Sequence, residues 1–355
     1  MKYLRHIALL CALLPALSCG GPHSRQVGGS KPERVFVNPL RDNGSSPCLV
    51  SAGGRFYYLQ SSYVRIGIWS AESIEGLKQA QENVVYSPER KYYISGPQLI
   101  RLDGKWYIYY SCEGADMSTR EIHVLENPSE DPLEGGFVHK AVLRTGCRKS
   151  VHPHVCSFKG QRYLLWSGSD ESAEIVRFNI HIARLQTPWR LSSKKSVILQ
   201  PKYEWECQWT SEGDNASDEV VYVNEAPQLL FSRDSTRLLL YFSASQTHTP
   251  YYCEGLAWAD ADCDPLDARS WHKLAEPVFS SDADAQAFGA GHLSFFRDAS
   301  DSLYLLYQAY SGGVLNRTED RSPRMQPASW GADGVPVLGR PLPLSTPVRE
   351  PSVAE

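Results

Sequence analysis

Acidic, imidazole and amide side chains stand at the same place in a recurring strand-turn-strand pattern. The set comprises Ser46, Gly96 with Gln98, His152, Glu225 and His292. A carboxylic acid can donate a proton, and a neutral imidazole, with a reference pKa of about 6.5, can accept one. If these positions converge, the sequence predicts a pocket for a polar ligand. The plainer interpretation, that they only begin strands, fits one polar residue better than a set in one register.

The pattern that carries these residues recurs five times. In the first three copies the residue before a proline lies eight positions ahead of a turn glycine and eleven ahead of a tyrosine, at 46/54/57, 96/104/107 and 152/160/163. The fourth and fifth copies are looser. The leading positions 46, 96, 152, 225 and 292 lie 50, 56, 73 and 67 residues apart. Such self-similarity is typical of repeat architectures.

The strands around this pattern predict the fold class. Runs such as Val64 to Trp69 bring each repeat to three or four strands. The sequence therefore predicts an all-β protein, a five-bladed β-propeller over residues 36–345. Only Ala71 to Gln81 indicates a short helix, and we expect residues 330–341 to close the ring or pack beneath it. Because innermost propeller strands run along the axis, their leading residues meet at one mouth, where ligands bind.

Composition limits the classes of partner. The chain has 355 residues, of which 42% are hydrophobic and 21% charged, so it can bury a large core. Its net charge of −4 and the lack of a long Lys/Arg run argue against nucleic acid or an anionic membrane as the main partner. No segment after the N-terminus is apolar over the roughly 18 residues that a membrane span needs. We expect a monomer.

The N-terminus is typical of an exported protein. Residues 1–20 combine Lys2 and Arg5 with an apolar run that ends in small residues, which predicts a signal peptide and a secreted or extracellular protein. Lipid attachment at Cys19 is the alternative. Residues 21–35 are expected to form a flexible lead-in and residues 346–355 a tail.

Cysteine spacing predicts no metal site. Seven cysteines follow residue 20, so at least one is unpaired, and their pairing cannot be deduced from the sequence. No Cys-x-x-Cys occurs, which argues against structural zinc.

Motifs in the second half of the chain indicate a family. They are Val221 to Gln228, Tyr252 to Leu256, Asp264 to Lys273 and Gly289 to His292. With these motifs in this order, the chain from Asn38 to about Gly334 resembles glycoside hydrolase family 43, in its α-L-arabinofuranosidase-like branch. The resemblance implies a five-bladed propeller that hydrolyses arabinose- or xylose-containing plant polysaccharides with inversion. The expected partner is therefore a plant-type polysaccharide or oligosaccharide.

The resemblance also implies roles for individual residues. Glu225, in an Asn-Glu-x-Pro setting, matches the general acid. Inverting hydrolysis also needs a carboxylate base roughly 6.5–9.5 Å away, and the family adds a third carboxylate that orients the acid. Ser46 stands at the position of the base and His152 at that of the third carboxylate. His292 matches an axial histidine that holds water or a metal ion, so we expect no required cofactor but a calcium ion or a water near His292.

Further residues complete the predicted substrate site. They are Gln98, Tyr222, Trp258, His292 and Gln308. The aromatic members can stack on sugar rings, although packing inside a blade explains an aromatic residue as readily.

The replaced carboxylates leave two functions open. A serine hydroxyl is not basic near neutral pH, which puts at risk the factor of about 10²–10⁴ that general base catalysis contributes. A neutral His152, or Asp42 four residues before Ser46, is an alternative base. The chain is then either a glycosidase with Glu225 as its acid or a propeller that binds glycans or a partner without hydrolysis. Uneven repeat lengths disfavour a third class, a purely structural ring.

Overall fold

The computed structural model describes residues 34–88, 93–114, 118–170, 175–209, 220–312, 315 and 320–353. The predicted signal peptide, Cys19 and nearly all of the predicted lead-in lie outside these residues, and those expectations stay predictions. No helix in the described ranges combines the length and the apolar character needed to cross a membrane.

Strands dominate the structure and form sheets of 13, 4, 4 and 2 strands. Parallel contacts of β8 with β10 and of β12 with β15 join the largest sheet. We divide the strands by their antiparallel pairing in chain order and refer to the resulting groups as blades 1 to 5. Blade 1 holds β2 (Cys48–Ala52), β3 (Arg55–Leu59), β4 (Ile66–Ala71) and β5 (Asn83–Tyr86). Blade 2 holds β6 (Ser95–Leu102), β7 (Lys105–Glu113), β8 (Arg120–Asn127) and β9 (Val138–Leu143). Blade 3 holds β10 (Lys149–Phe158), β11 (Gln161–Ser169), β12 (Ile175–Thr187), β13 (Arg190–Leu191) and β14 (Ser196–Leu199).

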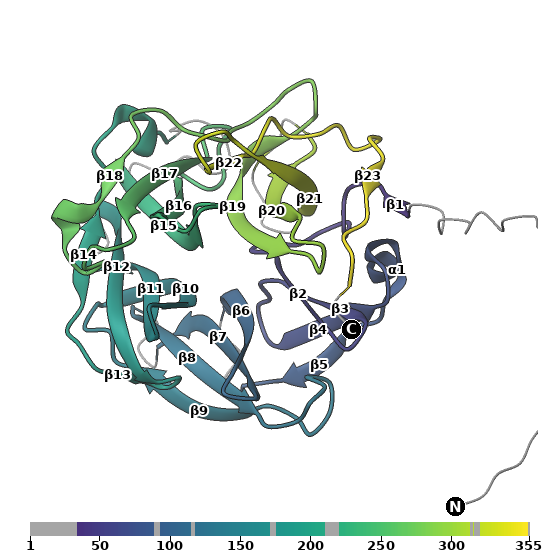
Figure 1. Cartoon of the computed structure of the whole chain (residues 1–355), viewed down its shortest axis with the longest axis horizontal. Coiled ribbons are helices and arrows are strands. Elements are labelled where there is room, and N and C mark those ends of the chain that lie inside the picture. Colours follow the sequence, from purple (N-terminus) through teal and green to yellow (C-terminus); the bar gives the residue numbers. More distant parts are fainter. Residues whose placement is uncertain are drawn as a thin grey trace, which may run out of the picture. The chain divides into compact units, whose positions relative to one another are not determined.

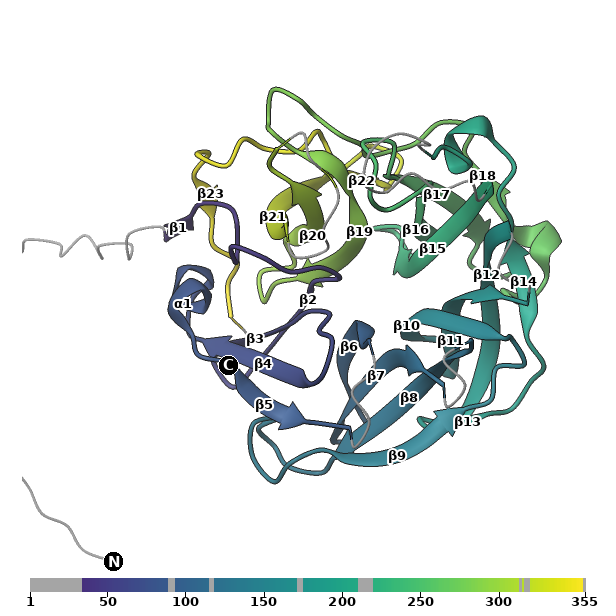
Figure 2. The same ribbon diagram turned by 180° about the vertical axis from the view of Figure 1, so that it is seen from behind.

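Blades 4 and 5 continue the order. Blade 4 holds β15 (Val220–Phe231), β16 (Arg237–Ala244), β17 (Cys253–Asp260) and β18 (His272–Lys273). Blade 5 holds β19 (Phe288–Arg297), β20 (Leu303–Tyr310), β21 (Arg321–Trp330) and β22 (Pro336–Val337). The blades follow one another around a common axis, with the first strand of each innermost (Figures 1 and 2). The prediction of an all-β propeller is confirmed.

The second strand of each blade explains the aromatic-rich half of the sequence repeat. All eight residues of β20 are buried, as are all but the first residue of β16. Neighbouring side chains in a strand point to opposite faces, so one face of such a strand packs toward the preceding blade and the other face toward the next blade. Consecutive residues accordingly enter different core clusters; these pairs are Tyr58/Leu59, Ile108/Tyr109, Leu164/Leu165, Leu240/Tyr241 and Leu305/Leu306. A chain of cores thus joins each blade to the next.

The start of the chain closes the ring. Asn38 donates its amide to the Met325 carbonyl (2.9 Å) and accepts the Met325 N–H (2.8 Å), which ties it to β21. Leu40 and Gly44 continue this pairing along β21. Outside the blades, β1 (Val35–Phe36) pairs with β23 (Val348–Arg349).

Residues 330–341 do not form this closure. Trp330 pairs with Pro336, so the segment turns to form β22, the outer strand of blade 5. The expectation that this segment closes the ring is therefore wrong, because the closure comes from residues 38–44. The alternative, that it packs beneath the ring, stays a prediction.

The helical content is small. Helix α1 (Ile74–Gln79) lies within the predicted range, begins at the N-cap Ser73 and buries Ile74 and Leu77 against blade 1. Two short 3-10 helices span Glu204–Glu206 and Ala268–Ser270. The seven cysteines after residue 20 are all free thiols.

Candidate active site

Each innermost strand bends near its start, and the bend recurs in every blade. The backbone φ is between 50° and 58° at Ser46, Gly96, His152, Ala226 and His292. At each of these residues the backbone N–H donates a hydrogen bond to a side chain of the preceding blade and not to the neighbouring strand of its own blade. The acceptors are Gln308 Oε1 for Ser46, Ser61 Oγ for Gly96, Ser111 Oγ for His152, Ser167 Oγ for Ala226 and Ser243 Oγ for His292. The repeated bend therefore fixes the inner strands to one another at one level of the axis.

The bends correct the register expected for blade 4. The sequence suggested that Glu225 is equivalent to Ser46 and His152, but the bent residue of β15 is Ala226. Glu225 precedes it and pairs with Ser243 just before the irregularity in the β15–β16 ladder. In the first three repeats the leading residue directly precedes a proline, whereas in the fourth repeat Ala226 stands between Glu225 and Pro227. Aligning the repeats on Glu225 therefore placed the bend one residue too early.

A hollow of about 270 Å³ opens at this end of the inner strands. It is lined by Ser45, Ser46, Tyr93, Ser95, Arg120, Lys149, Val151, His152, Phe178, Glu225, Thr247, His248, His292 and Arg321. Four predicted residues thus meet there, namely Ser46, His152, Glu225 and His292. We refer to this cavity as the Glu225 hollow.

Glu225 is a buried carboxyl group with one described hydrogen-bond donor. Its side chain is 13% exposed, and its Oε1 accepts a 2.7 Å hydrogen bond from the Tyr252 hydroxyl. Burial raises its pKa above the usual value, while the Tyr252 hydrogen bond and the Arg321 and Arg120 charges oppose that rise. A carboxyl group with a raised pKa keeps its proton at higher pH, as a general acid requires.

His152 lies beside this carboxyl group. Its Nδ1 is 3.6 Å from Glu225 Oε2 and has no hydrogen-bond partner among the described residues. Burial, together with the Arg120 and Arg321 charges, lowers the pKa of His152 to about 3. His152 is therefore neutral at pH 7, and its contact with Glu225 is not an ion pair.

His292 packs edge-on against His152, with ring centroids 4.6 Å apart. Burial lowers its pKa well below the usual value, and His152 and Arg321 add to the effect. Both imidazoles are thus uncharged polar groups. In the described part of the chain, no group of three or more His, Cys, Asp or Glu side chains is arranged to hold a metal ion.

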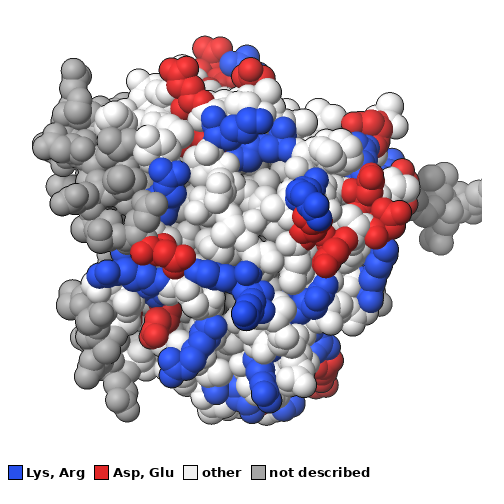
Figure 3. Space-filling view, turned by 90° about the vertical axis from the view of Figure 1, so that its left-hand side faces the viewer, with Lys and Arg blue, Asp and Glu red and all other residues white. Residues whose placement is uncertain are grey.

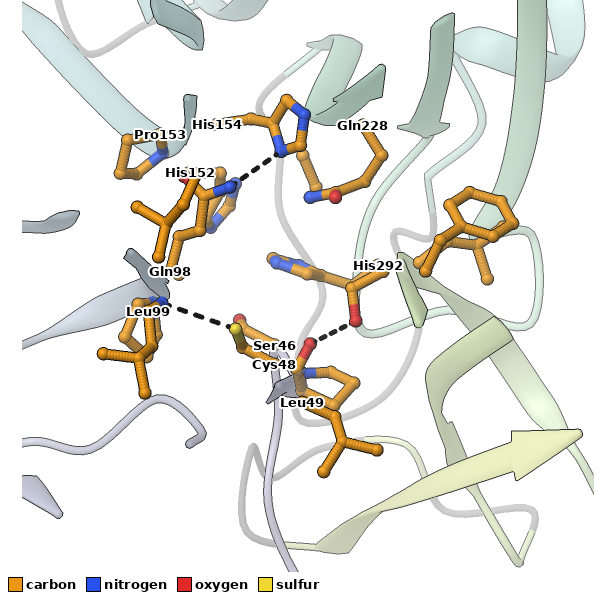
Figure 4. A pocket seen from close by; sticks show the side chains of 18 of the residues that line it. Ser46, Cys48, Leu49, Gln98, Leu99, His152, Pro153, His154, Gln228 and His292 are labelled. Atoms are coloured by element: carbon orange, nitrogen blue, oxygen red, sulfur yellow. Dashed lines mark hydrogen bonds between the residues drawn. The ribbon is translucent and has the colours of Figure 1, made fainter. Parts of the chain in front are cut away.

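Gln308 and Gln98 have structural partners. Gln308 Oε1 accepts the Ser46 N–H at 2.9 Å, and its Nε2 is buried without a described partner. Gln98 Oε1 accepts the Val155 N–H at 2.7 Å and its Nε2 donates to the Val155 carbonyl at 3.1 Å. Gln98 therefore joins β6 to β10, and it lines a second hollow of about 230 Å³ further along the axis (Figure 4).

The remaining predicted residues lie away from the Glu225 hollow. Tyr222 lies under the Arg177 guanidinium, 4.4 Å from ring centroid to charge. Trp258 is on β17, the third strand of its blade, where its ring contacts His272 at 4.5 Å. Asp42 is exposed and is not part of the lining.

The residues that surround Glu225 were not predicted from the sequence as members of the site. Tyr252 begins the approach to β17, and Arg120, Lys149 and Arg321 begin β8, β10 and β21. These cations carry no local motif, because strands far apart in sequence bring them together. The Asn-Glu-x-Pro setting of Glu225 was the signal that pointed to this half of the site.

Comparison with known proteins identifies the family. Residues 36–336 match the model of glycosyl hydrolases family 43. The chain belongs to this family. It is 29% identical over 362 residues to the "Extracellular exo-alpha-(1->5)-L-arabinofuranosidase" of Streptomyces avermitilis, covering 97% of this chain and 72% of that protein. A protein of the same name from Streptomyces chartreusis is 30% identical over 270 residues, covering 73% and 77% of the two chains.

Solved structures of family 43 proteins have the same fold. The α-L-arabinofuranosidase from Lactobacillus brevis superimposes with a TM-score of 0.76 at 26% identity, covering 88% of this chain and 98% of that one. A thermostable family-43 glycoside hydrolase gives a TM-score of 0.67 at 18% identity, covering 88% and 100%. The propeller described above is thus the fold of the family.

Proposed function

We propose that this chain is a secreted glycoside hydrolase that acts on arabinose- or xylose-containing glycans in the Glu225 hollow, with Glu225 as the general acid. The observation that carries the proposal is a buried carboxyl group of raised pKa that lines a cavity large enough for a sugar ring. Family membership and the arabinofuranosidase names of the relatives support the substrate class.

The geometry gives Glu225 a defined part in bond cleavage. Its Oε2 side faces His152, and its Oε1 is anchored by Tyr252. A protonated Glu225 donates to the glycosidic oxygen as the bond to the sugar breaks. The carboxylate that remains is stabilised by the Tyr252 hydroxyl and by the charges of Arg120 and Arg321, whose effect on the pKa of Glu225 has that sign.

The mechanism lacks an evident base to deprotonate the attacking water. His152 lies 3.6 Å from Glu225, well inside the roughly 6.5–9.5 Å that an inverting pair needs to hold a water on the far side of the sugar. It is therefore a partner of the acid rather than a base opposite it. Ser46 offers a hydroxyl group that has no basicity at neutral pH.

A second candidate function is glycan binding without hydrolysis. It is favoured by the residues at the two positions where the family resemblance expects carboxylates, Ser46 and His152. In that case the hollow keeps its shape and polar groups but lacks the group that deprotonates water.

The expected location is outside the cell. The relatives from both Streptomyces species are named extracellular, and the first 20 residues have the pattern of a signal peptide. Lipid anchoring at Cys19 is the alternative, and we expect a monomer with a plant-type polysaccharide or oligosaccharide as its partner.

Release of 4-nitrophenol from α-L-arabinofuranoside and β-D-xyloside substrates tests the proposal. We expect Glu225→Gln to lower kcat/KM by about 10²–10⁴-fold, because the amide cannot donate a proton to the leaving oxygen. Glu276→Gln removes an exposed carboxylate outside the hollow and is the matched control. Turnover that survives in Glu225→Gln contradicts the assignment. Absence of turnover in a wild-type protein that binds the sugars supports the second candidate.

A further inference from the structure

The described residues that line the Glu225 hollow carry more positive than negative charge. Arg120, Lys149 and Arg321 all line it, whereas Glu225 is its only carboxyl group among the described residues. The positive charge of Arg321 also acts on the two histidines of the hollow. It adds to the effect of burial in lowering the pKa values of His152 and His292.

Local structure holds these cations at the cavity. Arg321 is 4% exposed, and its Nη1 donates to Thr247 Oγ1 at 2.9 Å. Arg120 lies over the Tyr93 ring, 5.1 Å from its centroid, and is 3.6 Å from a Glu113 carboxylate oxygen. The parallel contact of β10 with β8 places Lys149 opposite Arg120.

Placing like charges together is unfavourable unless something offsets their repulsion. Glu113 partly offsets Arg120, and no described carboxylate forms an ion pair with Lys149. Glu225 offsets little while it is protonated. A bound anion would remove the repulsion and would gain charge-assisted hydrogen bonds from guanidinium groups, which match a carboxylate in shape.

We propose that the Glu225 hollow binds a sugar unit that carries a carboxylate, a hexuronate, with Arg120, Lys149 and Arg321 facing the acid group. The inference rests on the proposed function and narrows its substrate class. Sugar chemistry makes the two compatible, because D-glucuronate has the ring of D-xylopyranose with a carboxylate at C5. D-Galacturonate stands in the same relation to L-arabinopyranose.

Calorimetric titration of the full chain with matched sugar pairs tests the inference. The pairs are D-glucuronate with D-xylose and D-galacturonate with L-arabinose. We expect at least one uronate to bind about tenfold or more tightly than its neutral partner, the size of one charge-assisted hydrogen bond. Added salt should weaken uronate binding and leave neutral-sugar binding nearly unchanged, because it screens only the charge.

Substitution of Lys149 assigns the effect to the hollow. Lys149 is half-buried, so Lys149→Met should fold, whereas a change at the buried Arg321 could unfold the blade. We expect Lys149→Met to bind the uronate about tenfold more weakly and the neutral sugar unchanged. Lys194→Met removes an exposed charge outside the lining and should change neither constant.

The outcomes separate this inference from the proposed function. If the neutral sugars bind and the uronates bind no more tightly, the inference is wrong and the proposed function stands. If no sugar binds, both are wrong. If acetate or sulfate binds as tightly as the uronate, the hollow is a general anion site and the uronate assignment is wrong. Uronate binding that is equally lost in Lys149→Met and Lys194→Met also contradicts it.

Discussion

Two histidines, two residues apart on β10, show how the polar groups of the axis divide. His154 Nε2 accepts the Leu229 N–H at 3.2 Å, and its Nδ1 lies 3.3 Å from Gln98 Nε2. His152 Nδ1, in contrast, is buried with no described partner and faces Glu225. The His154 ring accepts a hydrogen bond from the backbone of the adjacent strand, whereas Nδ1 of His152 is available to a ligand.

The same division separates two levels of the inner strands. Away from the Glu225 hollow, side chains join each inner strand to the next in what we call the belt, formed by Cys48, Gln98, His154 and Ser294. Figure 4 shows Cys48, Gln98 and His154 of this belt. Their polar atoms meet backbone groups of the adjacent strand. Because buried polar groups are normally paired, the unpaired nitrogen of His152 and the nearby cations support the proposal that the hollow is the substrate site.

The largest stability effect is expected in the belt. His154→Ala removes the acceptor of the Leu229 N–H and leaves a cavity, which should lower the free energy of unfolding by about 2–4 kcal/mol. Urea denaturation followed by tryptophan fluorescence measures this loss.

His152→Asn is the matched comparison on the same strand. Asparagine tolerates the positive φ of 53° at that position, and no hydrogen bond of the ring is lost, so stability should change by less than about 1 kcal/mol. Equal losses in the two variants would show that belt and hollow are not distinct.

A smaller effect is expected where the backbone supports the hollow. A Cβ at Gly96 would lie 2.9 Å from both Cα and Cδ2 of His152, and Gly96 has a φ of 58°. Gly96→Ala should therefore cost about 1–3 kcal/mol and weaken sugar binding by displacing His152.

Gly104→Ala separates the two contributions to that cost. Gly104 has a φ of 77° but open space around its Cβ position, so the substitution reports the backbone penalty alone. Thermal unfolding of both variants gives the difference. A Gly104→Ala loss as large as that of Gly96→Ala would mean that contact with His152 adds nothing.

Much of the fold could be predicted because its information is local. Each strand-turn-strand unit spans only about 12 residues of sequence. The aromatic second strands need only their own sequence to be recognised as buried on both faces. The short helix near Ile74 was predicted for the same reason. The pairing of Trp330 with Pro336 was not predicted, because a turn-rich segment does not show by itself which strand it pairs with.

The site could be predicted only in part. Ser46, His152 and His292 were found because each occupies the same position in its repeat. Glu225 was found by motif, although its register was one residue off. Tyr252 lies in a motif of the family resemblance, but its contact with Glu225 was not predicted. The cations Arg120, Lys149 and Arg321 come from three different blades, and no local pattern shows that they meet.

The charges on the outer surface differ from those in the hollow. On the face shown in Figure 3, acidic and basic side chains occur together and are separated by uncharged surface. Exposed pairs such as Arg184 with Asp264 and Lys195 with Asp170 neutralise each other locally. An excess of one sign inside a cavity is therefore a property of the hollow and not of this face as a whole.

The smallest effect expected here concerns the proton on Glu225. Tyr252 donates to Glu225 Oε1, which stabilises the ionised form and lowers the pKa of Glu225. Tyr252→Phe removes that donor while keeping the ring, so the pKa of Glu225 should rise. Carboxyl ¹³C NMR titration measures the shift whether or not the protein hydrolyses glycosides. If it does hydrolyse them, the alkaline limb of kcat/KM should move to higher pH, because Glu225 then keeps its proton longer.

Tyr251→Phe, at the exposed neighbouring ring, should leave both titrations unchanged. A fall in the pKa of Glu225 in Tyr252→Phe would show that the tyrosine helps to keep the proton on the acid and does not oppose it.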